Sequence, residues 1–436
     1  MLIRRLRYIS FFIIVGCATS NLFAQDITQL GGDVTSLFTG RNAIQLPAPN
    51  VASEENRLLQ LSGFAVFHQF ANKAEGLGPT FNHVSCGSCH VNNGRGRVNF
   101  LPSSIGSPMV IKISLPGLNS DGSPKDVPGI GEQLRDHQLQ GKRLFDIKLQ
   151  WTDVEGSYPD GTTYTLRKPK LSFLVPGYKS HKLRPSLRMA PPVIGPGLLE
   201  AIPESTILAL SDPSDSNGDG ISGKPQYVPD IRTNQKKLGR FGFKSSHPTL
   251  EQQSAAAAFH DIGLTNILFN TSNNSDELSQ DELNRLSVYQ QIAGVPAATN
   301  QSDPKVIKGK GLFVTIGCED CHKMTLVTGT HEFSELSNQT IHPFTDLLLH
   351  NMGLGLADKR SEFEASGAEW RTTPLWGLGF SETLSNVKAN FLHDGRARSI
   401  EEAILWHAGE GNKSRKNFKN LAKSDRKALI AFLRSL

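Results

Sequence analysis

Two pentads of the form Cys-x-x-Cys-His constrain this chain more than any other feature: residues 86–90 (Cys-Gly-Ser-Cys-His) and residues 318–322 (Cys-Glu-Asp-Cys-His). Two thiols at this spacing can form thioether bonds to the two vinyl groups of one haem, and the histidine that follows then binds the iron. The pentads use four of the five cysteines in the chain. A Cys₄ zinc site is the alternative, but it leaves the histidine after each pair unexplained. The sequence therefore predicts two c-type haems, held by Cys86, Cys89, His90, Cys318, Cys321 and His322.

The N-terminus has the pattern of a secretory signal. Three arginines among the first seven residues precede an apolar run over residues 8–15, which is too short to span a bilayer. Cleavage after Ala24 would remove a signal peptide of residues 1–24. The alternative is a bacterial lipoprotein signal of residues 1–16, which would leave a lipid anchor on Cys17. Either route predicts a periplasmic protein, and the second predicts one attached to a bacterial membrane.

The charge of the chain excludes a nucleic-acid-binding role. Loss of the leader removes three arginines from a chain whose formal net charge is +5, and haem propionates would make the protein more negative still. The remaining sequence has no stretch of 18 apolar residues, so we do not expect an integral membrane protein.

The distance between the pentads predicts two haem-binding units, residues 25–300 and residues 301–436. Apolar and polar side chains alternate over residues 145–151, a turn sequence follows at 159–161, and residues 164–175 are typical of a return strand. A closing amphipathic helix resembles the terminal helix of class I cytochrome c. The expected fold is therefore mainly α-helical, with two cytochrome c-like haem domains and a small β-hairpin insertion in the N-terminal domain.

The sixth ligand of each iron determines whether a haem carries electrons or reacts with peroxide or oxygen. A capping box, Ser399 with Glu402, predicts a helix that begins near residue 400, and its apolar face ends at His407. We expect His407 to be the sixth ligand of the C-terminal haem, and the alternatives are Met324, Met352 and His350. No sixth ligand is obvious for the N-terminal haem, where an open or weakly held position is expected. The candidate histidines there are His68, His83 and His137.

Several motifs resemble those of a bacterial di-haem c-type oxidoreductase family, whose members are described as thiol oxidoreductases or di-haem peroxidases. The matching segments are residues 76–82, 94–96, 240–242, 248–250, 345–350, 371–378 and 393–398. The resemblance covers nearly all of the mature chain and implies peroxidase-like redox activity, with electron transfer between two covalently bound haems. Thiol exchange does not follow, because all four mature cysteines would be bound to haem.

The chain is more distantly similar to the di-haem cytochrome c peroxidases. In those enzymes the distal ligand of the C-terminal haem follows a His-Asp-Gly segment, and the same count from His393 reaches His407. The peroxidases usually have Met there, so the resemblance to a high-potential donor haem does not extend to this chain. The resemblance also implies that residues 191–200 bring Glu200 over the N-terminal haem as a catalytic acid and base. The alternative for Glu200 is a solvated acid at a helix terminus.

Residues 215–221 (Asp-Ser-Asn-Gly-Asp-Gly-Ile) fit the first half of an EF-hand loop. Oxygen ligands at alternate positions suit Ca²⁺, and the residues expected to bind it are Asp212, Asp215, Asn217 and Asp219. The twelfth position is Gln226 instead of Glu, so the loop is not an EF-hand. The alternative is a surface turn rich in Asp and Asn.

Taken together, these features predict a periplasmic di-haem cytochrome oxidoreductase of the peroxidase type. The N-terminal haem would react with peroxide or oxygen. The C-terminal haem would exchange electrons with a cytochrome, a copper protein or a small reductant. A non-catalytic electron-transfer cytochrome and a haem-dependent oxygenase are the alternatives.

Overall fold

The structure is a computed structural model, and it describes residues 27–40, 42–51, 53–98, 108–139, 144–270, 276–383 and 389–436. The predicted signal peptide, both of its cleavage sites and Cys17 lie outside these residues. Within the described ranges, no helix is long and apolar enough to span a membrane.

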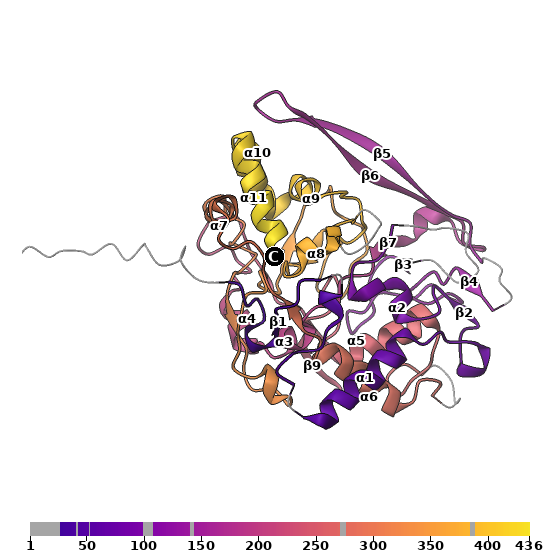
Figure 1. Cartoon of the computed structure of the whole chain (residues 1–436). Helices are drawn as coiled ribbons and strands as arrows, with labels where there is room; N and C mark the ends of the chain where they lie inside the picture. Colours follow the sequence, from indigo (N-terminus) through magenta and orange to yellow (C-terminus); the bar gives the residue numbers. More distant parts are fainter. Residues whose placement is uncertain are drawn as a thin grey trace, which may run out of the picture.

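The expectation of a mainly α-helical protein is wrong. The chain is 31% helix and 20% strand, and the described strands form seven two-stranded sheets (Figure 1). Most strands are only two to six residues long, and several pair with segments far away in the sequence. Pairs this short leave no run of alternating residues that could be recognised in the sequence, because tertiary contacts and not periodicity set their register. The fold gives no support for the expected pair of cytochrome c-like domains.

The helices are α1 (Glu54–His68), α2 (Cys86–Cys89), α3 (Pro196–Glu200), α4 (Glu204–Ala209), α5 (Leu250–Ala257), α6 (Gln280–Gln291), α7 (Pro304–Thr315), α8 (Leu378–Thr383), α9 (Ile400–Trp406), α10 (Asn412–Asn420) and α11 (Lys423–Ser435). A π-helical turn, Ala258–Ile262, follows α5 directly. The paired strands are β1 (Thr35–Ser36) with β10 (Val295–Pro296), β2 (Thr80–Phe81) with β4 (His137–Gln138), β3 (Met109–Ser114) with β7 (Arg184–Met189), β5 (Ile147–Ser157) with β6 (Thr163–Phe173), β8 (Tyr227–Asp230) with β9 (Gln235–Leu238), β11 (Leu326–Val327) with β12 (Thr340–Ile341), and β13 (Leu349–Asn351) with β14 (Glu369–Arg371). All pairs are antiparallel except β1 with β10.

The helix that precedes each pentad crosses a later helix at a glycine. Helix α1 crosses α6 at Gly63, where an added Cβ would lie 2.1 Å from the carbonyl oxygen of Arg285. Helix α7 crosses α11 at Gly309, where an added Cβ would lie 2.1 Å from the carbonyl oxygen of Ala428. Any side chain would separate the helices, so both crossings depend on glycine. Helix α7 ends at Thr315, directly before the second pentad, and α1 packs against α2, which carries the first.

We expect Gly309→Ala to lower the free energy of unfolding by about 1–3 kcal/mol, the usual cost of overpacking a close contact. The intrinsic helix propensity of alanine would act in the opposite direction, so a stabilised variant would contradict the crossing. Chemical denaturation measures the effect. Ile307→Ala is the matched control in the same helix, because Ile307 is 54% exposed and its loss should change stability by less than about 0.5 kcal/mol.

The predicted hairpin is confirmed as β5 and β6, and it is longer than expected, with eleven residues in each strand. Figure 1 shows it extending from the body of the protein toward α10 and α11. The hydroxyl of Tyr158 at its turn donates to Glu401 at 2.6 Å, and Asp160 accepts from Arg426 at 2.7 Å. The hairpin lies in the N-terminal half of the sequence but packs on the C-terminal half. The domain boundaries therefore stay a prediction.

A buried charged network also joins the two halves of the chain. Glu362 accepts hydrogen bonds from Arg188 of β7 and from Arg360. Lys244 has no exposed surface, and its ammonium donates to the carbonyl oxygens of Ser366 and Glu369. Burial lowers the pKa of Lys244 to about 8. The sequence offers no periodicity that predicts such a network.

Candidate haem sites

The first pentad forms the short helix α2, and Ser85 caps it by accepting from the N–H of Ser88. His90 follows the helix, and its Nδ1 lies 2.7 Å from the carbonyl oxygen of Pro191. A carbonyl can only accept, so Nδ1 carries the proton and Nε2 keeps its lone pair. This second hydrogen bond is the usual means of orienting a metal-binding histidine.

The second pentad repeats this arrangement. The N–H of His322 donates to the carbonyl oxygen of Cys318 at 3.0 Å, and Nδ1 of His322 donates to the carbonyl oxygen of Phe344 at 2.9 Å. Burial lowers the pKa of His322 to about 4 and also lowers that of His90. Both imidazoles are therefore neutral near pH 7 and can donate Nε2 to a metal.

The zinc alternative for the cysteines is wrong. Among the described residues, the one group of three or more possible ligand atoms close enough for a metal contains a single cysteine, Cys321. The cysteines therefore belong to two separate pentads.

A large cavity opens beside the second pentad. Cys318, Cys321 and His322 line it, and His407 lines it as well. Its apolar lining consists of side chains such as Phe313, Leu356, Leu375, Leu378, Phe391, Ile400, Ile404 and Leu433. Among the described residues, the charged side chains that line it are three arginines and no aspartate or glutamate: Arg95, Arg371 and Arg415. An apolar cavity with cationic groups fits a haem, whose ring is apolar and whose two propionates are anions.

His407 lines the same cavity as His322 and has one ring nitrogen free. It follows α9, whose N-terminus is capped by Ser399 as predicted, although Glu402 bonds to Arg398 and does not complete the capping box. Nδ1 of His407 donates to the carbonyl oxygen of Ala403 at 2.8 Å, which leaves Nε2 with its lone pair. Burial is the main cause that lowers the pKa of His322, and the charge of His407 lowers it further.

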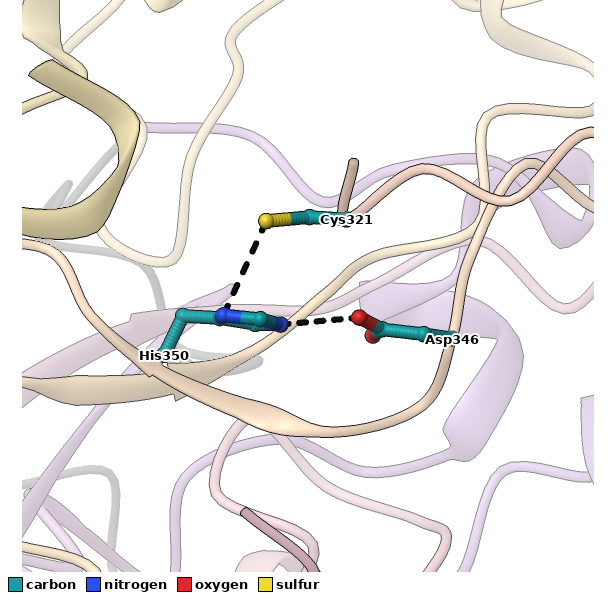
Figure 2. A group of neighbouring side chains, drawn as sticks. All are labelled: Cys321, Asp346 and His350. Carbon is teal, nitrogen blue, oxygen red and sulfur yellow. Dashed lines mark hydrogen bonds and ion pairs between the residues drawn. The ribbon is translucent and has the colours of Figure 1, made fainter. Parts of the chain in front are cut away.

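His350 also lines the cavity, but both of its ring nitrogens are occupied. Nε2 bonds to Asp346 at 2.8 Å, and Nδ1 bonds to Glu410 at 2.7 Å. Figure 2 shows His350 between Cys321 and Asp346, with the sulfur of Cys321 3.6 Å from Nδ1. Burial opposes protonation, but the bonds to Asp346, Cys321 and Glu410 outweigh it and raise the pKa of His350 well above its ordinary value. With both ring nitrogens bonded to carboxylates, the geometry favours His407 over His350 as the sixth ligand.

The two methionine alternatives differ. Met324 is only 4% exposed in the main core and does not line this cavity. Met352 does line it, and its Cε lies near His407, since both would contact a Cβ added at Gly411. The structure therefore favours His407 and leaves Met352 as the comparison residue.

The wall of the cavity includes a stacked pair that sequence reasoning missed. The rings of Trp370 and His393 lie 3.6 Å apart and nearly parallel, at 11°. The ammonium of Lys244 lies 4.1 Å from the centre of the Trp370 ring. Because the imidazole covers one face, the ammonium lies on the other, and a cation there disfavours removal of an electron from the indole.

The candidate histidines of the N-terminal site are mostly engaged elsewhere. His83 accepts from the N–H of Val84, and His137 is paired with Asp136 at 3.0 Å. The ring of His68 contacts the first pentad, since it lies 2.5 Å from a Cβ added at Gly87, and its Nδ1 bonds to the carbonyl oxygen of Phe64 at 3.0 Å, which leaves Nε2 free. The cavity beside Cys86 is lined by polar side chains as well as apolar ones, and neither Cys89 nor His90 is among its lining residues.

A carboxylate that sequence reasoning missed lies near the first pentad. Asp261 is in the π-helical turn, accepts from Nε2 of Gln133 at 2.6 Å, and exerts its charge on Cys86, Cys89 and His90. Turns of this kind occur often at functional sites. No motif marks Asp261 in the sequence, because the contact joins segments far apart in the chain.

Glu200, the predicted catalytic acid, lies at the end of α3. One carboxylate oxygen accepts from the N–H of Leu250 at 2.8 Å, and the other accepts from Nε2 of Gln291 at 2.8 Å. Burial would raise its pKa, but hydrogen bonds from His331, Gln291 and Leu250 lower it. Glu200 lines neither of the two cavities, so the geometry favours a structural role that links α3 to the start of α5.

The predicted calcium loop folds as a series of Asx turns. Asp212 accepts from the N–H groups of Ser216 and Asn217, and Asp215, Asn217 and Asp219 each accept from a backbone N–H within the loop. Among the described residues, the three aspartates do not form a group close enough to share a metal ion. Calcium binding stays a prediction.

The sequence of the chain matches one known protein family over almost its whole length. Residues 24–107, 109–275 and 270–436 match a family described as "Di-haem oxidoreductase, putative peroxidase". Hydrazine synthase of Kuenenia stuttgartiensis, solved under 20 bar of xenon, aligns over 92% of this chain and 98% of its own, at 12% identity and a TM-score of 0.37. A likeness this weak carries no argument about function, and no curated protein matches the chain. The family match spans almost the whole sequence, and the chain belongs to the di-haem oxidoreductase family.

Proposed function

We propose that this di-haem oxidoreductase is a c-type peroxidase in which the two sites have different roles. The observation that carries the proposal is the arrangement of His322 and His407. Both line one apolar cavity with Cys318 and Cys321, and both have Nδ1 bonded to a backbone carbonyl, which leaves Nε2 for iron. When bound at the two pentads, haem iron supplies one-electron redox chemistry and, where its sixth position is open, a binding site for peroxide or oxygen.

At the C-terminal site, the residues of this chain favour an electron carrier. His322 and His407 would both hold the iron of a haem in this largely apolar cavity. A haem held by two histidines would supply electron transfer without a position for a substrate.

At the N-terminal site, we propose a reactive centre. His90 is oriented by Pro191, and neither His83 nor His137 has the free geometry of His407. His68 does have it, because its Nδ1 bonds to the carbonyl oxygen of Phe64 at 3.0 Å, so a reactive centre requires that His68 does not bind the iron. Asp261 offers a carboxylate beside the pentad as a proton acceptor. The reaction would be H₂O₂ + 2 H⁺ + 2 e⁻ → 2 H₂O, with the two electrons supplied singly by a cytochrome, a small copper protein or an organic reductant.

We further propose that the protein acts in the periplasm. The basic N-terminus followed by a short apolar run supports export, and lipid attachment at Cys17 would hold the mature protein at a membrane. Mass spectrometry of the mature protein tests this, since cleavage after Ala24 and lipidation of Cys17 give different masses.

Haem attachment is tested with two double variants, Cys86→Ala/Cys89→Ala and Cys318→Ala/Cys321→Ala, which serve as controls for each other. We expect two covalent haems in the wild type and one in each variant, because each pentad supplies both thioethers of one haem. A pyridine haemochrome assay on denatured protein counts them. A wild-type protein without covalent haem would end the proposal.

The division of roles is tested by electron paramagnetic resonance of the oxidised and half-reduced protein. We expect one low-spin bis-histidine signal, which disappears in the Cys318→Ala/Cys321→Ala variant, and a high-spin signal in at least one redox state. Turnover of peroxide with a reduced cytochrome should accompany the high-spin signal. Two low-spin bis-histidine signals without turnover would instead identify a non-catalytic electron carrier, and oxygen uptake with an organic substrate would identify an oxygenase.

A further inference from the structure

Arg95 differs from the other enclosed arginines of the described chain in the absence of an acidic neighbour. Burial lowers the pKa of five arginines, and in four of them a nearby carboxylate opposes the effect: Arg135, Arg167, Arg240 and Arg371. For Arg95, burial alone acts and lowers the pKa to about 10. Nε of Arg95 has no hydrogen-bond partner although it is fully buried.

The side chain of Arg95 lines the C-terminal haem cavity. It shares this lining with His322 and His407, and its guanidinium lies 5.4 Å from the centre of the Phe391 ring. An enclosed charge without a counter-charge is unfavourable, so such charges in proteins are usually paired. Among the described residues no aspartate or glutamate lines this cavity, which points to an anion that the cavity itself holds.

Arg95 reaches this cavity from the segment of the other haem. It follows His90 by five residues, and the chain between them turns through Asn92 and Asn93, both in the left-handed region at φ 55° and 57°. The side chain of Asn93 accepts from the hydroxyl of Tyr289 at 2.8 Å. Gly96 packs closely against Ala190. A Cβ added at Gly96 would lie 3.0 Å from the backbone nitrogen of Ala190. These contacts fix the backbone on both sides of Arg95.

We propose that the guanidinium of Arg95 binds a propionate of the C-terminal haem, so that the segment carrying the proximal ligand of one haem neutralises the charge of the other. The planar fork of arginine matches a carboxylate, which makes a propionate the fitting anion. Arg371 is a second cationic group on the same cavity, but Gly242 and Thr372 already accept two of its donors and Asp346 lies near it. The proposal rests on the proposed function, because it requires haem at the second pentad.

The test is a redox titration of the intact two-haem protein, followed by the low-spin signal of the C-terminal haem. A positive charge near the haem stabilises the reduced iron, so Arg95→Gln should shift the midpoint potential of the C-terminal haem to a more negative value. The potential of the N-terminal haem should move less. Arg97→Gln is the matched control, because Arg97 is exposed two residues further along and its loss removes the same formal charge. Equal potentials in the wild type and in both variants would overturn the proposal.

Arg95→Lys gives a second test that does not depend on how well the glutamine variant folds. Lysine keeps the charge but loses the fork, so the shift should have the same direction and be smaller than for glutamine. A free anion is the competing partner of Arg95. If the wild-type potential follows the phosphate concentration and that of Arg95→Gln does not, the partner is a free anion and the proposal fails.

The haem count separates this inference from the proposed function. A wild-type protein with no haem at the second pentad would refute both. A wild-type protein with two haems, whose potentials are unaffected by the loss of Arg95, would refute only the role of Arg95.

Discussion

Replacing His407 with methionine will raise the midpoint potential of the C-terminal haem and abolish its bis-histidine low-spin signal. The geometry behind this expectation is the free Nε2 of His407, which shares a cavity with Nε2 of His322. A thioether favours the reduced iron relative to an imidazole, and axial ligands together span about 0.8 V of haem potential. A redox titration followed by absorbance and electron paramagnetic resonance measures the change.

Met352→Leu is the control for this experiment. Met352 lines the same cavity and lies next to His407, so a disturbance of the packing alone would appear in both variants. We expect the leucine variant to keep the wild-type spectrum. If His407→Met keeps the wild-type low-spin signal, or if Met352→Leu loses it, His407 is not the ligand.

Glu362→Gln should lower the free energy of unfolding by about 3–5 kcal/mol, the usual cost of removing one partner from a buried ion pair. Glu362 is 5% exposed and accepts from Arg188, from Arg360 and from the hydroxyl of Ser246. Without its charge, the cations of the network are left buried and uncompensated. Glu364→Gln is the control, because Glu364 is exposed two residues away, and its loss should cost less than about 0.5 kcal/mol. Equal denaturation midpoints for the two variants would contradict the role of the network.

The same residue predicts a dependence of stability on pH. Burial would raise the pKa of Glu362, but the charges of Arg188, Arg360 and Lys244 outweigh it and hold the pKa well below the ordinary value of 4.5. A carboxyl with a depressed pKa stabilises the folded state above the unfolded pKa, and this contribution is lost as the pH falls through the folded pKa. The wild type should therefore lose stability below about pH 4.5, and Glu362→Gln should lose less over the same range.

Local patterns in the sequence predicted local structure correctly. The alternation and turn residues near residue 159 identified the hairpin, which is confirmed as β5 and β6. The start of α9 at Ile400 and the closing helix α11 are confirmed as well. These features depend on side-chain periodicity and capping residues within one segment, so they can be recognised without knowledge of the rest of the chain.

The balance of helix and strand was predicted wrongly because most strand pairs are not local. Strand β1 pairs with β10 across most of the chain, and β3 pairs with β7 over a shorter but still large separation. Residues with no strand pattern of their own become strands when packing brings two extended segments together.

The sequence by itself determined the two pentads, the family to which the chain belongs and the candidate axial ligand His407. Only the tertiary structure decided which of the remaining residues surround each pentad. His350 was a reasonable ligand by type, yet Asp346 and Glu410 occupy both of its nitrogens. Arg95 follows the first pentad in sequence but lines the cavity of the second. The physical reason is that motif spacing reports the contacts of one short segment, whereas the partner of a buried polar group is chosen by the packing of segments that are far apart in the chain.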